Sequence, residues 1–202
     1  MVNTSRYNLS KDSAGIDDDG VLKNKMNIKD EERLANIETL ALEKTYDHFI
    51  DLSKNQEIET NLSLLFSIHK YFLGDLYDWA GEIREVNISK GDTLFVPPLY
   101  IKQELGKLKS KFDQYIPKSD DTDEEVAEKL AYLHCELNVI HPFRDGNGRA
   151  IRLFINLLAL NVGYDLIDFN DINREEYLQA SKDCMKKEYS NMKDIIFEEL
   201  EN

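Results

Sequence analysis

Cysteines and long apolar runs are scarce in this chain of 202 residues. The two cysteines, Cys135 and Cys184, are too few for a disulfide framework and lack the spacing of a metal-binding motif, so we expect buried or half-buried free thiols. No apolar run approaches the length of a transmembrane helix. Residues 1–11 lack the apolar stretch of a signal peptide. We therefore expect a cytoplasmic protein that has no membrane partner.

Positive charge is scarce as well. The chain has 25 lysines and arginines against 39 aspartates and glutamates, which gives a net charge of −14. Such a surface is poorly suited to bind nucleic acid or anionic membranes, so we expect neither as a partner. A hydrophobic content of 42% is ordinary for a globular protein with a core. We expect an irregular arm over residues 1–20 and a single domain over residues 21–202.

Most of the chain has the apolar spacing of amphipathic helices. Between the second and third helical segments, Val86 and Ile88 alternate with polar residues, and residues 94–96 lead into two prolines, which predicts one β-hairpin. The fold class predicted is therefore all-α, a helical bundle with one hairpin. The predicted helices cover approximately residues 30–50, 61–77, 101–115, 126–140, 149–160, 173–187 and 190–200.

The segment between two of these helices, residues 141–152, gathers the chemistry of the chain. Pro142 disfavours helical geometry in the residue before it, so His141 stands at a helix end. An imidazole has an intrinsic pKa suited to removing a proton near neutral pH. Asp145 could hold a magnesium ion, because Mg²⁺ is usually bound by one or two carboxylates together with phosphate oxygens.

The same segment has the residues of an anion site. Gly146, Asn147 and Gly148 can turn backbone N–H groups toward one point just before a helix, where phosphate binds well. Arg149 and Arg152 share one face of the first helical turn, and guanidinium groups hold phosphate in a bidentate manner. A base, a metal ligand, a phosphate nest and an arginine clamp together predict phosphoryl or nucleotidyl transfer.

These twelve residues match the signature H-x-F-x-[DE]-G-N-G-R-x-x-R at every specified position, so the chain resembles the Fic family over roughly residues 20–200. The resemblance implies a bundle of the Fic type that transfers AMP from ATP, with Mg²⁺, to a serine, threonine or tyrosine hydroxyl of a target protein. His141 is then the base and Asp145 the metal ligand. The residues expected to bind the nucleotide are Arg144, Gly146, Asn147, Gly148, Arg149, Arg152 and Tyr177. A core or surface role fits Tyr177 equally well.

The predicted hairpin resembles the Fic flap, which pairs edge-on with a segment of the target by β-augmentation. On that resemblance a target protein docks on the hairpin. The flap residues expected to contact the target are Ile88, Lys90, Gly91, Asp92, Thr93 and Phe95.

Several alternatives remain open at this stage. Related Doc-type kinases carry lysine where this chain has Gly148, so glycine favours nucleotidyl transfer over phosphorylation. Transfer of UMP or phosphocholine, or a binding module with a vestigial site, also stays possible, whereas the absence of a G-x-x-x-x-G-K-[ST] motif excludes a P-loop NTPase. His48, His69 and His134 are interpreted as core histidines.

The inhibitory motif of many Fic proteins, [ST]-x-x-x-E-[GN], has no full match in this chain. In those proteins its glutamate pairs with the second arginine of the signature, which is Arg152 in this chain. Arg152 is therefore either free or capped in trans by a small antitoxin-like partner.

Overall fold

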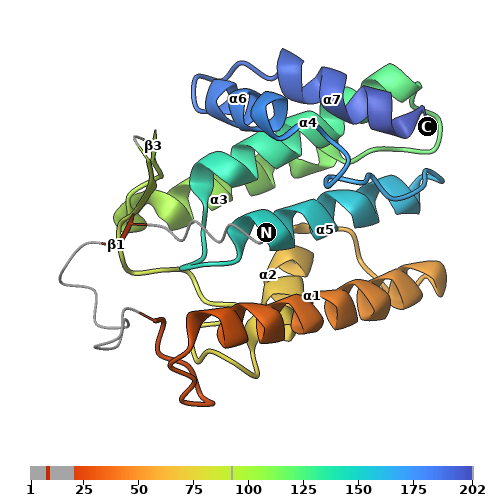
Figure 1. The fold of residues 1–202 in the computed structure, drawn as a ribbon. Coiled ribbons are helices and arrows are strands. Elements are labelled where there is room, and N and C mark those ends of the chain that lie inside the picture. The colour runs from red at the N-terminus through yellow and green to blue at the C-terminus, as the bar shows by residue number, and fades with distance from the viewer. Residues whose placement is uncertain (1–7, 10–20, 92, 202) are drawn as a thin grey trace.

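The computed structural model describes residues 8–9, 21–91 and 93–201. This part of the chain forms seven helices and three short strands, so the prediction of an all-α bundle is confirmed (Figure 1). No helix within it is long and apolar enough to cross a lipid bilayer. The helices are α1 (Glu31–Lys54), α2 (Leu62–Leu73), α3 (Pro98–Tyr115), α4 (Asp123–Ile140), α5 (Asn147–Asn161), α6 (Arg174–Cys184) and α7 (Ser190–Leu200).

Side-chain caps begin four of the helices, each accepting a hydrogen bond from an N–H group that the helix itself leaves unpaired. Asp30 caps α1, Asn61 caps α2 and Asn173 caps α6, close to where the predicted helices begin. The start of α4 is a finding of the structure. Thr122 and Glu125 form a reciprocal capping box there, in a segment that the sequence analysis leaves outside the helix.

Among the helix boundaries that differ from the prediction, two lie next to a glycine or a proline. α2 ends at Leu73 and is followed by Gly74, so the segment up to residue 77 is not helical. α3 begins at Pro98, three residues earlier than the spacing predicts. Proline suits the first turn of a helix because its missing N–H would have no intrahelical partner there.

The helix α5 lies at the centre of the bundle. It packs against α1, α2 and α4, and α6 and α7 pack against α4 (Figure 1). Every residue of α5 from Leu153 to Ala159 is buried, as the nearly continuous apolar run predicts. The polar Asn156 is satisfied there, because its side chain accepts from the Ile167 N–H at 2.8 Å and donates to the Ile167 carbonyl at 3.3 Å.

The strands form a small antiparallel sheet in the order β1-β2-β3 at one end of the bundle (Figure 1). β2 (Ile88–Lys90) and β3 (Thr93–Leu94) are the predicted hairpin. β1 (Asn8–Leu9) pairs with the other edge of β2 and was not predicted. The arm over residues 1–20 is thus not irregular throughout, and its other residues lie outside the described ones.

The prediction of free thiols is wrong. Cys135 in α4 and Cys184 at the end of α6 form a disulfide, and both are fully buried. Their Cα atoms lie 5.1 Å apart, within the range that a disulfide requires. The two residues are 49 positions apart in the sequence, so their proximity follows from the packing of α6 on α4 and not from any local spacing.

A buried ion pair ties α1 to the start of α5. The Glu38 carboxylate, 3% exposed, accepts from Arg149 Nη1 at 2.8 Å and from the Tyr77 hydroxyl. The Arg149 guanidinium also lies over the Phe72 ring, 4.9 Å from its centroid. A buried carboxylate is stable when charged and neutral donors surround it in this way.

We expect Glu38→Ala to lower the free energy of unfolding by about 3 kcal/mol, because it leaves the Arg149 charge without its buried partner. Urea denaturation followed by circular dichroism measures the change. Glu43→Ala, an exposed substitution in the same helix, is the matched control and should change the value by less than about 0.5 kcal/mol. Equal effects of the two substitutions would contradict the role given to Glu38.

Candidate active site

His141 ends α4 in a left-handed conformation, with φ 50° and ψ 63°. Its N–H donates to the Leu137 carbonyl at 2.8 Å, so the helix stops immediately before Pro142 as predicted. A left-handed backbone is uncommon for a residue other than glycine and is maintained here by the surrounding structure. The turn carries the chain away from the helix axis and directs it into the signature loop.

The protonation state of His141 follows from its contacts. Nδ1 lies 2.9 Å from the Asn138 carbonyl oxygen, which can only accept, so Nδ1 carries the proton and Nε2 has the lone pair. Burial lowers the pKa of His141 to about 3, the Asn138 carbonyl opposes that shift, and the charges of Arg84 and Lys90 add to it. The ring stacks on Phe95 with centroids 3.8 Å apart. His141 is therefore a neutral, oriented base at neutral pH.

Arg84 positions this base and was missed by the sequence analysis. It is 4% exposed, and its Nε donates to the His141 carbonyl at 2.8 Å. Its guanidinium also donates to the carbonyls of Val86 and Val96, which flank the hairpin strands. One buried side chain thus joins the flap to the His141 turn. An isolated arginine in a turn-like segment gives no signal in the sequence that it is buried.

Two further side chains fix the signature loop. Asn147 is fully buried, and its amide pairs with both backbone groups of Phe143, at 2.8 Å and 2.7 Å. This side chain therefore closes the loop, and only its backbone remains a candidate for nucleotide contact. His69 accepts from the Gly81 N–H at 2.8 Å and donates to the Asp145 carbonyl at 2.8 Å. Its assignment as a satisfied core histidine is confirmed.

The start of α5 has the features expected of a phosphate site. Gly146 caps the helix with φ 76°, and no side chain accepts a hydrogen bond from the first turn. The first N–H groups of α5 can therefore donate to an anion bound in front of the helix. A Cβ on Gly146 would lie 2.9 Å from Leu73 Cδ1, and the φ of 76° is one that residues with a side chain rarely adopt, so glycine suits this position. A Cβ on Gly148 would meet only Arg152 Nη1, at 3.8 Å, so the space beside Gly148 is open.

A pocket of about 280 Å³ brings several predicted residues together. Four of them belong to the expected catalytic and nucleotide-binding set, namely His141, Gly148, Arg152 and Tyr177. The flap residues that line it are Lys90, Gly91, Thr93 and Phe95. Ile88 is instead buried behind the flap, and Asp92 lies outside the described residues. The other lining residues were not predicted from the sequence, namely Asn138, Leu178, Ser181, Lys182 and Met185.

The pocket concentrates positive charge in a chain that is strongly acidic overall. Lys90, Arg152 and Lys182 all line it. Partial burial lowers the pKa of Lys90, and the charges of Arg152 and Arg174 act in the same direction. Within residues 21–91 and 93–201, no salt bridge to Arg152 is formed. Such a pocket is suited to bind a polyanion.

The structure places Arg144 away from the pocket of His141. Its side chain lines a separate cavity of about 230 Å³, together with Lys23, Lys25 and Trp79, and not the pocket of His141. Its Nε and Nη2 atoms are buried without a hydrogen-bond partner in the described structure. We therefore leave Arg144 out of the candidate nucleotide contacts.

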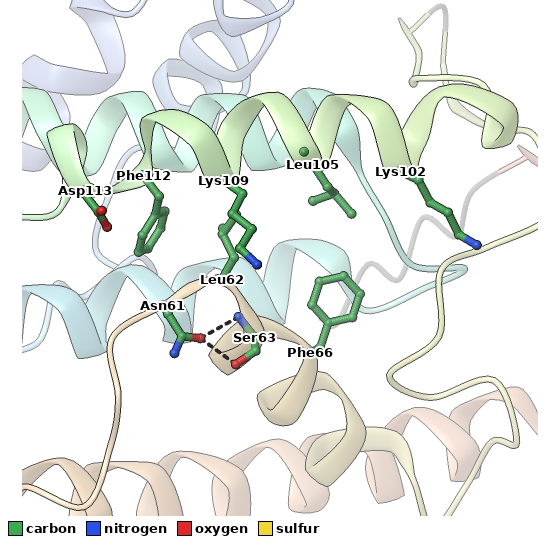
Figure 2. Close-up of a pocket in the computed structure, with 10 residues that line it drawn as sticks. Asn61, Leu62, Ser63, Phe66, Lys102, Leu105, Lys109, Phe112 and Asp113 are labelled. Carbon is green, nitrogen blue, oxygen red and sulfur yellow. Dashed lines mark hydrogen bonds between the residues drawn. The ribbon is translucent and has the colours of Figure 1, made fainter.

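A larger cavity lies elsewhere, between the start of α2 and α3 (Figure 2). Its volume is about 650 Å³, and Phe66, Leu105 and Phe112 form much of its apolar wall. The Asn61 amide oxygen, at its edge, is already used by Ser63 N and Oγ. The smaller pocket is the better candidate because it alone of the two is lined by His141 and by Gly148 from the start of α5.

Burial of three histidines predicts acid sensitivity. Burial lowers the pKa of His69, His134 and His141 from 6.5 to about 3. Above pH 6.5 these histidines are neutral in both the folded and the unfolded chain, so protonation does not reduce the free energy of unfolding. As the pH falls from 6.5 toward 3, the histidines become protonated in the unfolded chain but stay neutral in the folded chain, so the free energy of unfolding decreases.

We therefore expect the urea midpoint to fall between about pH 7 and about pH 5, with each histidine contributing up to about 1.4 kcal/mol per pH unit. His141→Gln should flatten this dependence, because one of the three groups is removed. An unchanged midpoint over this interval in the original protein would contradict the neutral, buried state of these rings.

Comparison with known proteins agrees with this geometry. The sequence profile of the Fic/DOC family matches residues 59–159, half of the chain. The "Probable protein adenylyltransferase Fic" of Escherichia coli K12 is 34% identical over 164 residues, which cover 80% of this chain and 78% of that protein. The protein adenylyltransferase VbhT of Bartonella schoenbuchensis is 32% identical over 87% of this chain and 36% of its own length.

Solved structures show the same fold. The N-terminal Fic domain of Bep8 from Bartonella sp. 1-1C superposes with a TM-score of 0.74 at 27% identity, over 91% of both chains. A Fic domain from Bartonella quintana, solved with bound ADP, gives a TM-score of 0.72 at 25% identity, over 93% of this chain and 91% of its own. The chain therefore belongs to the Fic/DOC family.

Proposed function

We propose that this protein is an adenylyltransferase that moves AMP from ATP to a hydroxyl side chain of a target protein and releases pyrophosphate. The observation that carries the proposal is the neutral, oriented His141 in one pocket with the open space at Gly148 and the positive charge of Arg152. Relatives named protein adenylyltransferases support the reaction class. Solved Fic domains with bound ADP or AMPPNP support a nucleotide in this fold.

In the proposed reaction, His141 Nε2 removes the proton of the target hydroxyl as its oxygen attacks the α-phosphorus. The bond between the α-phosphorus and the bridging oxygen breaks, and pyrophosphate leaves with that electron pair. The Asn138 carbonyl stabilises the imidazolium that forms, because it accepts from the protonated Nδ1. A positioned general base of this kind contributes about 10²- to 10⁴-fold to the rate.

The chain's own groups hold the nucleotide. The start of α5 at Gly146 directs N–H groups toward the α- and β-phosphates, and Arg152 binds the leaving end. Tyr177 lies in the pocket wall and offers a ring for the adenine base. The signature suggests that Arg149 binds phosphate, but its guanidinium already forms ion pairs with Glu38 and Asp145. In this proposal Arg149 therefore fixes the start of α5.

Asp145 is the residue that would hold magnesium. Its side chain is 14% exposed, and Oδ1 accepts from the Gly146 N–H at 2.6 Å, which orients the carboxylate at the mouth of the nest. One carboxylate fits Mg²⁺, which completes its shell with water and phosphate oxygens. When bound, the ion neutralises part of the triphosphate charge.

The target docks on the flap in this proposal. β1 already covers one edge of β2, so strand addition is left to β3, which has no neighbouring strand on its other side within the described residues. Leu94 in β3 is 76% exposed and offers an apolar contact beside that edge. Backbone pairing tolerates many target sequences.

Two other reactions and one inhibitory partner remain beside this proposal. Phosphorylation in the manner of Doc is disfavoured by the empty space at Gly148, where a lysine would stand beside Arg152. Whether UMP can be transferred depends on the pocket wall formed by Tyr177 and Leu178. Replacing ATP with UTP in the assay tests this alternative. A small antitoxin-like partner that caps Arg152 in trans is compatible with the absence of a salt bridge to Arg152 in the described structure.

We expect His141→Ala to lose at least about 100-fold in transfer rate, because the base is removed. The assay incubates the protein with α-labelled or γ-labelled ATP, Mg²⁺ and cell lysate, and counts protein-bound label. Label should come from α-labelled ATP alone. His48→Ala, at a half-buried histidine outside the pocket, is the control and should retain activity. Full activity of the His141 variant, or label from γ-labelled ATP alone, would overturn the proposal.

We expect Arg152→Ala to weaken ATP binding about tenfold or more, since a hydrogen-bonded ion pair with phosphate contributes about 1.5–3 kcal/mol. Isothermal titration calorimetry measures the affinity. Arg144→Ala is the matched control, because that guanidinium lines the separate cavity. The placement of the nucleotide would be wrong if Arg144→Ala weakened binding more than Arg152→Ala.

A further inference from the structure

A second cluster of metal-ligating side chains lies behind the pocket wall, where α6 packs on α4. One ring nitrogen of His134 and the sulfurs of Cys135 and Cys184 all lie within 4.8 Å of one another. The two cysteines are fully buried and His134 is 2% exposed. The two sulfurs are joined as a disulfide in this structure. The sequence analysis found no metal spacing here because α4 and α6 bring the ligands together from distant positions.

His134 is not the satisfied core histidine that the sequence predicts. Its Nε2 lies 2.9 Å from the Tyr177 hydroxyl, whereas its Nδ1 is buried with no hydrogen-bond partner in the described structure. A buried polar atom without a partner is uncommon and calls for an explanation. Metal ligation is such an explanation, because a ligating histidine usually has its other ring nitrogen hydrogen-bonded to a neighbouring group, as Nε2 is here.

We propose that His134, Cys135 and Cys184 form a thiol-dependent metal site that binds a Zn²⁺-class cation when the disulfide is reduced. A dithiol reductant supplies two electrons and two protons, which converts the disulfide to two thiols while the reductant forms its own disulfide. Binding of the cation then releases both thiol protons to solvent. Two thiolates balance the charge of a dication, so the occupied site is neutral in its buried setting.

The ligand set selects the class of metal. Thiolate and imidazole ligands favour zinc and copper(I) over magnesium or calcium, which prefer oxygen. Two cysteines and one histidine are a known zinc ligand set with a fourth position for water. No fourth histidine, cysteine, aspartate or glutamate joins the cluster in residues 21–91 and 93–201. The site is therefore distinct from the single carboxylate proposed to hold magnesium.

The position of the cluster connects it to the nucleotide pocket, and this step rests on the proposed function. Cys184 is the last residue of α6, and the same helix supplies Tyr177, Leu178 and Ser181 to the pocket wall. Either the disulfide or the metal anchors α6 to α4, which ends at His141. The reduced protein without metal has neither link, so packing and the hydrogen bond between His134 Nε2 and the Tyr177 hydroxyl are left to hold its pocket wall.

Metal binding by the full chain tests the site directly. The protein is reduced with a phosphine, freed of reductant under nitrogen, dialysed against Zn²⁺ or Co²⁺, and compared with the oxidised protein. We expect about one zinc per chain in the reduced protein and none in the oxidised one, by elemental mass spectrometry. Cobalt should give the charge-transfer absorption of thiolate ligation, which a carboxylate site cannot give. Reduced protein with no thiolate–cobalt band would overturn the proposal.

Two variants assign the ligands. Cys184→Ser removes one sulfur, and His134→Gln removes Nδ1 while an amide remains near the Tyr177 hydroxyl. Each should weaken zinc binding by about tenfold or more relative to the reduced original protein. His48→Gln is the matched control and should bind zinc normally. Unchanged zinc affinity in both ligand variants would overturn the assignment, and the measurements on the original protein stand even if a variant fails to fold.

The link to the nucleotide is measured separately. We expect ATP to bind with similar affinity to the oxidised protein and the zinc-loaded reduced protein, and severalfold more weakly to the reduced, metal-free protein. Equal ATP affinity in all three states would overturn the proposed link between the metal site and the nucleotide pocket, but it would not contradict the metal site itself. If no state binds ATP, the proposed function fails, while the zinc stoichiometry and the cobalt spectrum still decide the metal site.

Discussion

The structure depends on the way in which buried polar side chains hold one short loop in a shape that it would not adopt alone. Arg84 donates to the His141 carbonyl, His69 donates to the Asp145 carbonyl, and Asn147 pairs with both backbone groups of Phe143. Each bond replaces water at a buried backbone group, whose desolvation would otherwise be costly. Together they maintain the left-handed turns at His141 and Gly146. The chemistry of the loop follows from its fixed shape.

Around this loop the bundle acts as a rigid support. α4 ends at His141 and α5 begins at the Gly146 turn, and the two helices pack on each other through a largely apolar core. Glu38 ties α1 to the start of α5 through Arg149, and the disulfide from Cys184 to Cys135 ties α6 to α4. A site held by helices keeps its geometry better than one held by loops alone. The flap has less support than the helices, because it consists of two short strands that Arg84 joins to the loop by hydrogen bonds.

The sequence predicted local structure well and distant contacts poorly. Apolar periodicity located most helices, because that signal is confined to a few neighbouring residues. The signature likewise pointed to His141 and Gly148, which the structure places in the wall of one pocket. Contacts between distant segments carry no such local signal, so the Cys135–Cys184 disulfide was missed. For the same reason Arg144, adjacent to the site in sequence, was assigned to a pocket that its side chain does not line.

The central claim is that the loop presents His141 to the α-phosphate of ATP. A crystal structure with a non-hydrolysable ATP analogue and Mg²⁺ tests this most directly. The account predicts the α-phosphate at the start of α5, with the γ-phosphate at Arg152 and the adenine beside Tyr177. A nucleotide bound in the reverse direction, with its γ-phosphate next to His141, would contradict it and indicate a kinase. Binding in the cavity of Arg144 would contradict it equally.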